Sequence, residues 1–272
     1  MFDTLCKFLA ESFSEDYATW LLGRPVTLTK LSPTELSLEP IRADSLILEQ
    51  SEDLVLHLEF QTEPDEKMGF RILDYRLRVY RRFPAKTMHQ VVIYLKKTKS
   101  PLVYQDSFQV GETIHRYRVI RLWEQPSEVF LKKGGLLPLA ILTKSEEQII
   151  RLREIAQRLD TIENPGVRAN LMAATAVFAG LVMEPETIKT ILRSDIMKES
   201  AFYQDILQEG RQEGRQEGRQ EGRQEGRQEG LLEGKLKTIP LLKKLGLTIA
   251  EIAEELEIDV SLVNQFVANQ NN

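Results

Sequence analysis

The stretch of sequence that decides the fold is Leu54-Val-Leu-His-Leu-Glu-Phe-Gln61. Apolar residues occupy every second position, and His57, Glu59 and Gln61 lie between them. Because successive side chains of a β-strand point to opposite faces, this alternation predicts a strand with one apolar face. Glu59 and Gln61 are then neighbours on the other face, close to the end of the strand.

A second acid precedes this strand in the sequence. Asp44 opens a strand-like segment that runs to Glu49, and a turn up to Asp53 allows the two segments to pair as a hairpin. Such pairing can bring the carboxylates of Asp44 and Glu59 together. Two carboxylates at a strand end form a hard oxygen site suited to Mg²⁺ or Mn²⁺. A divalent ion there activates water and stabilises the leaving group in phosphodiester hydrolysis.

The alternative for Asp44 and Glu59 is a pair of solvated surface charges, which is the commoner role of acids on neighbouring strands. The strand around Glu59 is otherwise apolar and is expected to be central in its sheet. Burying a carboxylate there without a cation is unfavourable. This argument favours the metal site as the interpretation.

The elements around the hairpin alternate between helix and strand. Apolar spacing predicts helices over residues 2–22 and Glu66–Phe83. Further strands are expected at Glu35–Pro40, His89–Lys96 and His115–Trp123. This order predicts an α/β (α+β) domain over residues 1–145, in which helices flank a mixed sheet.

The rest of the chain is expected to be all-helical. Residues 146–204 form a helical extension, and residues 205–235 contain the repeat Glu-Gly-Arg-Gln from Glu209 to Gly230. A glycine at every fourth position lowers helix stability by roughly 1 kcal/mol each relative to alanine. The repeat is therefore either a linker or a helix whose glycine stripe allows a second copy to approach. The helical sequence on both sides favours the helix and a homo-oligomer.

Residues 236–272 are expected to form a C-terminal helical hairpin. Thr248 and Glu251 have the spacing of a capping box at the start of a helix. The outline is similar to a helix-turn-helix, yet Val260–Asn272 contains no lysine or arginine for phosphate contacts. A packing or dimerising hairpin is therefore favoured over one that binds DNA.

The composition limits which kinds of protein and which kinds of site the chain can form. The 272 residues carry a formal net charge of −5, so contact with nucleic acid requires local basic patches such as the arginines of Glu66–Phe83. Cys6 is the only cysteine, which excludes an internal disulfide and a cysteine-built zinc site. The sequence contains no nucleotide-binding glycine motif, no nucleophile elbow and no apolar run that spans a bilayer. A cytoplasmic protein without membrane contact is expected.

Three groups of residues resemble the PD-(D/E)XK nuclease superfamily. They are the opening Phe2-Asp-Thr-Leu-Cys-Lys7, then Arg42-Ala-Asp44, and then Leu58-Glu-Phe-Gln61. In particular the chain resembles the recombination-promoting nuclease/transposase-like family, in which long Glu-Gly-Arg-rich stretches are typical. The motifs cover about half of the chain, and the general layout covers nearly all of it.

This resemblance implies a restriction-endonuclease-like fold and a Mg²⁺-dependent DNA endonuclease of low sequence specificity, linked to recombination or mobile elements. It implies a metal ion held by Asp44, Glu59 and the backbone carbonyl of Phe60, with Gln61 in place of the usual active-site lysine. Since a glutamine only hydrogen-bonds, a second cationic group is expected to assist. The accessory candidates are Asp3, Lys7, His57, Arg71 and Tyr75. The alternative function is a catalytically inactive nuclease-like scaffold that oligomerises through its repeat.

Overall fold

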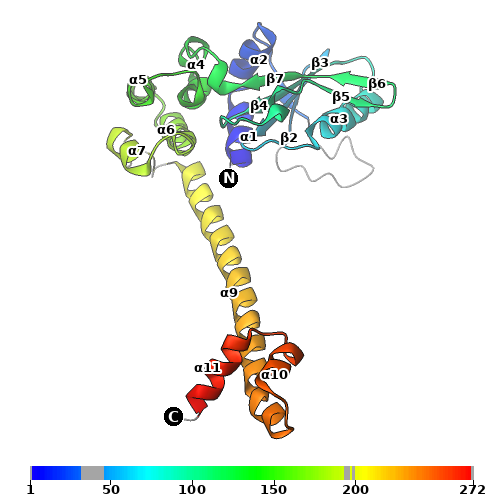
Figure 1. Ribbon diagram of the computed structural model, residues 1–272. Helices are drawn as coiled ribbons and strands as arrows, with labels where there is room; N and C mark the ends of the chain where they lie inside the picture. The colour runs from blue at the N-terminus through cyan, green and yellow to red at the C-terminus, as the bar shows by residue number, and fades with distance from the viewer. Residues whose placement is uncertain (1, 32–45, 193–196, 198–199, 271–272) are drawn as a thin grey trace. The chain divides into compact units, whose positions relative to one another are not determined.

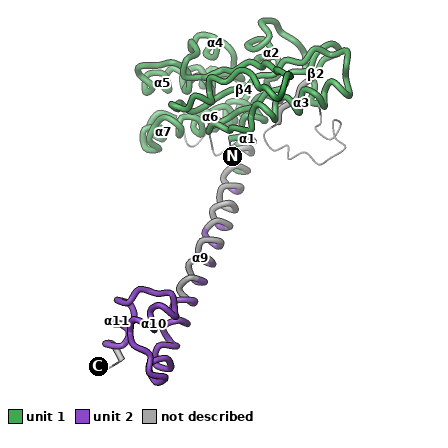
Figure 2. Tube along the Cα trace, turned by 45° about the vertical axis from the view of Figure 1, so that its right-hand side comes forward, with its two compact units in different colours: residues 1–207 green, residues 208–272 purple. Residues whose placement is uncertain are grey.

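Residues 2–31, 46–192, 197 and 200–270 are described by the computed structural model (Figure 1). Asp44 and the expected strand Glu35–Pro40 lie outside these residues. The chain divides into two compact units, Met1–Leu207 and Gln208–Asn272 (Figure 2). The first unit contains helices and a mixed sheet, which confirms the predicted fold class at the level of a mixed α/β protein.

The centre of the first unit is a sheet that contains, within the described ranges, five strands in the order β1-β2-β3-β4-β7. These strands are β1 (Thr29–Lys30), β2 (Leu46–Gln50), β3 (Leu54–Gln61), β4 (Thr87–Tyr94) and β7 (Arg118–Arg121). β2 runs antiparallel to β3, whereas β3, β4 and β7 are parallel. The strand predicted over residues 54–61 is confirmed with both of its bounds.

One face of the sheet carries the main hydrophobic core. Leu56, Leu58 and Phe60 of β3 pack there with Val91 and Ile93 of β4. The covering elements are α1 (Phe2–Ser12), α2 (Ser14–Leu22), the 3₁₀ segment η4 (Gly134–Leu142), α5 (Gln148–Asp160) and α6 (Pro165–Ala179). The apolar set of β3 therefore lies on one face, as its alternation predicts.

The other face of the sheet is covered by α3 (Met68–Arg82). Val55 of β3 packs there with Tyr75 of α3, and Val92 of β4 packs with Ile72. The predicted helix Glu66–Phe83 is confirmed, with small differences at its ends. Because both faces of the sheet are covered, every residue of β3 except the last is buried.

A two-stranded ribbon lies against α3. It consists of β5 (Ser107–Val110) and β6 (Thr113–Arg116). Gly69 of α3 permits the close contact, because a Cβ atom at that position would lie 2.9 Å from Cβ of Phe108. The ring of Phe108 also meets that of Phe70 edge-on, with centroids 6.2 Å apart. These contacts fix the ribbon against the beginning of α3.

The prediction of a single strand over His115–Trp123 is wrong. β6 ends at Arg116 and β7 begins at Arg118, and the backbone N–H of Tyr117 between them donates to the carbonyl of Asp106 at 2.9 Å. The two strands pair with different partners, β5 and β4. The chain passes from the ribbon to the sheet at Tyr117, and an alternation of apolar residues does not reveal such a change of partner. The short 3₁₀ turn η3 (Leu122–Glu124) follows β7.

Helices and 3₁₀ turns complete the first unit. They are η2 (Pro101–Tyr104), α4 (Glu128–Leu131) and α7 (Pro185–Ile191), together with α5 and α6. At the start of α6 the side chain of Asn164 accepts a hydrogen bond from the N–H of Val167 at 3.0 Å, and Pro165 follows the cap. No helix in the described part of the chain is both long and apolar enough to cross a membrane.

The second unit is helical, and the repeat lies within its first helix. The helices are α9 (Ala201–Lys244), α10 (Ile249–Glu255) and α11 (Val260–Gln270), of which α9 begins in the first unit. Ile239, Ile252 and Val263 are buried at the centre of the second unit. The predicted capping box is confirmed, since the Thr248 hydroxyl accepts from the N–H of Glu251 and the Glu251 carboxylate accepts from the N–H of Thr248.

Candidate functional site

Glu59 is a fully buried acid on the α3 face of β3, close to the C-terminal end of that strand. Its Oε1 atom lies 3.4 Å from Nε2 of His57, which precedes it by two residues on the same face. Its Oε2 atom has no hydrogen-bond partner among the residues that the structure describes. A buried carboxylate of this kind requires a positive charge nearby.

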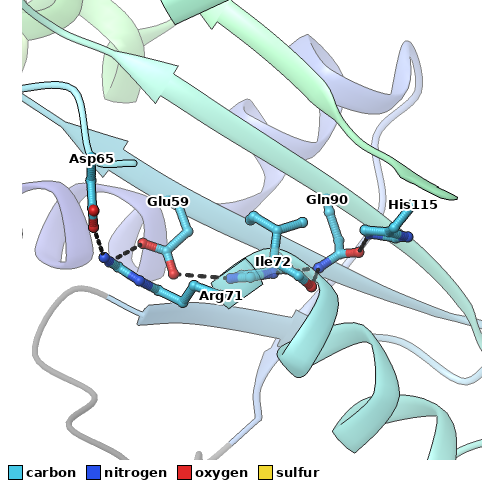
Figure 3. Close-up of polar contacts among 7 residues, drawn as sticks. Glu59, Asp65, Arg71, Ile72, Gln90 and His115 are labelled. Carbon is cyan, nitrogen blue, oxygen red and sulfur yellow. Dashed lines mark hydrogen bonds and ion pairs between the residues drawn. The ribbon is translucent and has the colours of Figure 1, made fainter. Parts of the chain in front are cut away.

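Arg71 supplies a positive charge from the beginning of α3. Its Nη1 atom lies 3.6 Å from Oε2 of Glu59, and its Nη2 atom forms an ion pair with Asp65 in the loop after β3 (Figure 3). The Arg71 side chain is 33% exposed, whereas that of Glu59 is 1% exposed. The guanidinium, whose planar fork suits two carboxylates at once, therefore connects the buried acid with a partly exposed one.

The charge of Glu59 also acts on Tyr75 of α3. Burial raises the pKa of Tyr75 to about 12, and the negative charge of Glu59 contributes to the increase. The Tyr75 ring meets the His57 ring edge-on, with centroids 5.1 Å apart. Tyr75 is therefore protonated at neutral pH and packs beside the histidine that contacts Glu59.

His57 belongs to a row of polar side chains that leads from β3 to the ribbon. Its Nδ1 atom lies 3.0 Å from Nε2 of Gln90, its direct neighbour in the register of β3 and β4. The same Nε2 atom donates to the carbonyl of Ile72 at 2.7 Å, and Oε1 of Gln90 lies 2.8 Å from Nε2 of His115. Figure 3 shows the polar contacts from Asp65 at one end to His115 at the other.

Four of the residues that the sequence singled out lie together in this site. They are His57, Glu59, Arg71 and Tyr75. Gln61 follows Glu59 by two residues at the partly buried end of β3. The side chain of Phe60 packs in the core on the opposite face of the sheet. A metal-binding role for the Phe60 carbonyl stays a prediction.

Two of the remaining candidates, Asp3 and Lys7, lie elsewhere. Asp3 and Lys7 belong to α1, whose buried residues pack on the face of the sheet opposite to Glu59. Asp44 is outside the described residues. In the sequence it precedes by two positions Leu46, which lies opposite Glu59 in the register. The proposed roles of these three residues stay predictions.

Three residues of the site were not predicted from the sequence. They are Asp65, Gln90 and His115. Gln90 is a polar residue inside an apolar strand, which is a usable signal of a buried hydrogen bond. Asp65 stands just before a predicted helix, where an acid has ordinary local roles. His115 gives no sequence signal, because its contact depends on the chain changing partners after β6.

Some of the basic residues of α3 and of the segment after β4 are paired with acids. Arg78 forms an ion pair at 2.8 Å with the aspartate one turn earlier on α3, and Lys96 forms one at 3.1 Å with Glu63. Arg81 and Arg82 are exposed at the C-terminal end of α3. Their exposure makes these two arginines the accessible positive charges of that helix end.

A metal site is only partly assembled by the described side chains. Within the described ranges, no group of three or more histidine, cysteine, aspartate or glutamate side chains is placed to hold an ion. Glu59 offers one oxygen without a hydrogen bond, so a divalent ion requires further oxygen ligands from Asp44, the backbone or water. An ion at Oε2 would also compete with Arg71 for that atom.

Comparisons of the chain with protein-family models, with curated proteins and with solved structures found no match. The function of the chain is therefore inferred from its own residues.

Proposed function

We propose that this chain is a Mg²⁺- or Mn²⁺-dependent DNA endonuclease with a restriction-endonuclease-like core. The observation that carries the proposal is Glu59, a fully buried carboxylate at the end of a central strand, whose Oε2 atom lacks a hydrogen-bond partner among the described residues. Arg71 gives this buried carboxylate a positive neighbour at 3.6 Å, beyond hydrogen-bond distance. The Oε2 atom, which no hydrogen bond occupies, is therefore suited to coordinating a divalent cation.

The layout of the first unit supports this proposal. An antiparallel pair, β2 and β3, is followed by α3 and by the parallel strand β4. The resemblance to PD-(D/E)XK nucleases implies such a mixed sheet between helices, with the acids at the end of the pair. The position of Asp44 in the sequence, two residues before the register partner of Glu59, agrees with a shared ligand set.

Four residues have a role in the proposed reaction. A divalent ion, when bound, polarises a phosphodiester oxygen and acidifies a water molecule. Asp44 and Glu59 would hold that ion through carboxylate oxygens, and the uncharged amide of Gln61 would orient a water molecule by a hydrogen bond. Arg71, which lies 3.6 Å from Glu59 and is one-third exposed, supplies the positive charge that a lysine gives in most of the superfamily.

The proposed substrate is DNA without a strict sequence preference. Arg81 and Arg82 are exposed at the C-terminal end of α3, about 15 Å along the helix from Arg71, and are suited to phosphate contacts, which fix the position of DNA but carry no sequence information. The net charge of −5 makes such local contacts necessary. The link to recombination or mobile elements, and a cytoplasmic location, are proposed from the resemblance alone.

Nicking of supercoiled plasmid tests this proposal. The full-length chain is expected to nick plasmid in the presence of Mg²⁺ or Mn²⁺ and to stop when a chelator is added. The Asp44→Asn variant is expected to lose the activity. Nicking that continues in the chelator, or at the full rate in Asp44→Asn, would contradict the proposed chemistry.

A second candidate function is a catalytically inactive scaffold that oligomerises, and one feature of the second unit favours it. After the repeat, Leu231, Leu241 and Leu245 are 59%, 60% and 69% exposed. Together with Gly234 and Thr238 they follow the alternating three- and four-residue spacing of a coiled-coil seam. A second copy of the same helix is the partner that such a seam fits.

Light scattering distinguishes the two candidates. An oligomer that becomes a monomer in the double variant Leu231→Gln/Leu241→Gln, with no nicking by either protein, would favour the scaffold. Nicking by the unmodified chain would favour the endonuclease, whatever its oligomeric state.

A further inference from the structure

A row of hydrogen bonds behind Glu59 has one defined direction. Gln90 sets it, because its Nε2 atom lies 2.7 Å from the carbonyl oxygen of Ile72 on α3. A carbonyl oxygen only accepts, so the group that faces it is the NH₂ of the amide. The second hydrogen of that NH₂ is then available to Nδ1 of His57, which lies 3.0 Å away. The opposite orientation of the amide would place two oxygens face to face.

The orientation of Gln90 determines the tautomer of His57. Since Nδ1 of His57 accepts from Gln90, the ring proton is on Nε2. The Nε2 atom lies 3.4 Å from Oε1 of Glu59, so its N–H donates to the carboxylate. At the other end, Oε1 of Gln90 accepts from Nε2 of His115 at 2.8 Å. Each member of the row therefore donates in the direction of Glu59.

The two oxygens of Glu59 have different surroundings as a result. Oε1 faces the His57 donor, whereas Oε2 has no hydrogen bond among the described residues and faces the guanidinium of Arg71 at 3.6 Å. The ring of Tyr75 packs edge-on against His57 and restrains its rotation. A histidine whose rotation and tautomer are both fixed holds one carboxylate oxygen and leaves the other for a ligand.

We infer that His57 is a positioning residue for Glu59, and that Gln90 sets the tautomer in which His57 acts. The row fixes the Glu59 carboxylate so that Oε2 faces the ligand. The consequence for catalysis rests on the proposed endonuclease function, but the row itself does not. His115 extends the row to the β5–β6 ribbon, whose contact at Gly69 and Phe108 keeps that histidine within reach of Gln90.

NMR of the full-length chain tests the row without any assay of activity. Imidazole ¹⁵N shifts are expected to show His57 protonated on Nε2, and a proton on Nδ1 instead would overturn the inference. The Gln90→Glu variant is expected to place a proton on Nδ1 of His57, because a carboxylate at that position only accepts. An unchanged His57 spectrum in Gln90→Glu would also overturn it.

The positioning of Glu59 is tested by the ¹³C shift of its side-chain carboxyl. The shift is expected to change in His57→Phe and to stay unchanged in His89→Phe, which alters an exposed histidine next to Gln90 on β4. If His57→Phe does not fold, His57→Leu removes the same donor and provides the same test, whereas His57→Gln, whose amide restores a donor near the place of Nε2, is expected to leave the Glu59 shift close to that of the unmodified chain. A Glu59 shift that does not respond to loss of the donor would overturn the positioning role.

A cleavage assay then separates this inference from the proposed function. The turnover of His57→Phe is expected to fall about 10- to 100-fold, as for other residues that orient a metal ligand, with an unchanged KM for DNA. His57→Gln is expected to recover part of the loss, and His89→Phe to match the unmodified chain. Full turnover in His57→Phe would overturn the positioning role. Absence of cleavage by the unmodified chain would contradict the proposed endonuclease function. The NMR results would still show whether the hydrogen bonds from His115 to Glu59 are formed as inferred.

Discussion

Nη1 of Arg71 lies 3.6 Å from Oε2 of Glu59, and the same guanidinium forms an ion pair with Asp65. Arg71, at the start of α3, thereby places a positive charge beside the carboxylate of Glu59, which solvent does not reach. Since a divalent ion at Oε2 would compete for the same oxygen, the Arg71–Glu59 contact relates the stability of the fold to the affinity of the site.

Arg71→Ala is expected to destabilise the first unit. Breaking a fully buried ion pair costs about 3–5 kcal/mol, and because Arg71 is one-third exposed we expect about 1–3 kcal/mol. Urea unfolding followed by tryptophan fluorescence reports on this unit, since both tryptophans, Trp20 and Trp123, belong to it. The matched control Arg78→Ala breaks an ion pair within α3 and is expected to cost less than about 0.5 kcal/mol. Equal effects of the two substitutions would show that Arg71 does not stabilise Glu59.

The same substitution is expected to raise the affinity for a divalent ion while lowering the rate of DNA cleavage. Removing Arg71 relieves the repulsion between its guanidinium and a divalent ion at Oε2 of Glu59. Two like unit charges near 4 Å apart repel by about 4 kcal/mol at an effective dielectric constant of about 20. Screening reduces this figure, so at least a threefold decrease in the Kd for Mn²⁺ is expected by calorimetry. A weaker Mn²⁺ affinity in Arg71→Ala would mean that Arg71 and the ion do not share the oxygen.

Tyr75 is expected to make the first unit less stable at high pH. Its folded pKa of about 12 exceeds the ordinary value of 10.0, so between these values the unfolded chain releases the proton first. The free energy of unfolding therefore falls as pH rises from about 10 toward 12. Ultraviolet titration is expected to lose one late-ionising tyrosine in Tyr75→Phe and none in Tyr80→Phe, which alters an exposed residue of the same helix. Loss in Tyr75→Phe of a tyrosine that ionises near the ordinary value of 10.0 would contradict the raised pKa of Tyr75.

Thr248→Ala is expected to destabilise the second unit by about 1 kcal/mol, the usual effect of removing a helix cap. The Thr248 hydroxyl accepts from the N–H of Glu251, so that amide is expected to exchange with solvent about fivefold faster in the variant. Thr238→Ala serves as the control, since the Thr238 hydroxyl bonds within α9 to the carbonyl of Lys235 and caps nothing. Unchanged exchange at Glu251 would show that the cap does not stabilise α10.

The elements of the first unit that local pattern determines were predictable from the sequence. β3 has a strict alternation, and α3 has apolar residues at helical spacing, so both were located closely. The sequence predicts one strand over His115–Trp123, because the separation of β6 and β7 at Tyr117 depends on their pairing with β5 and β4. Local pattern does not contain that information.

The site was predictable only in part, for the same reason. Glu59 and His57 follow from the alternation of one strand. The approach of Arg71 depends on how α3 crosses the sheet, and the contact between Gln90 and His57 depends on the register of two parallel strands. The sequence makes Arg71 one of five accessory candidates, and the structure places its guanidinium beside Oε2 of Glu59.

The measurement that most directly tests the central claim compares the Mg²⁺-dependent plasmid nicking rates of Glu59→Gln and Glu63→Gln. The first removes the buried carboxylate with little change in shape, and the second removes an exposed acid four residues later that pairs with Lys96. We predict that Glu59→Gln lowers the rate by roughly 100-fold or more, since ligand and charge are both lost, while Glu63→Gln leaves it unchanged. A folded Glu59→Gln protein, verified by its tryptophan fluorescence, that nicks plasmid at the unmodified rate would contradict the account.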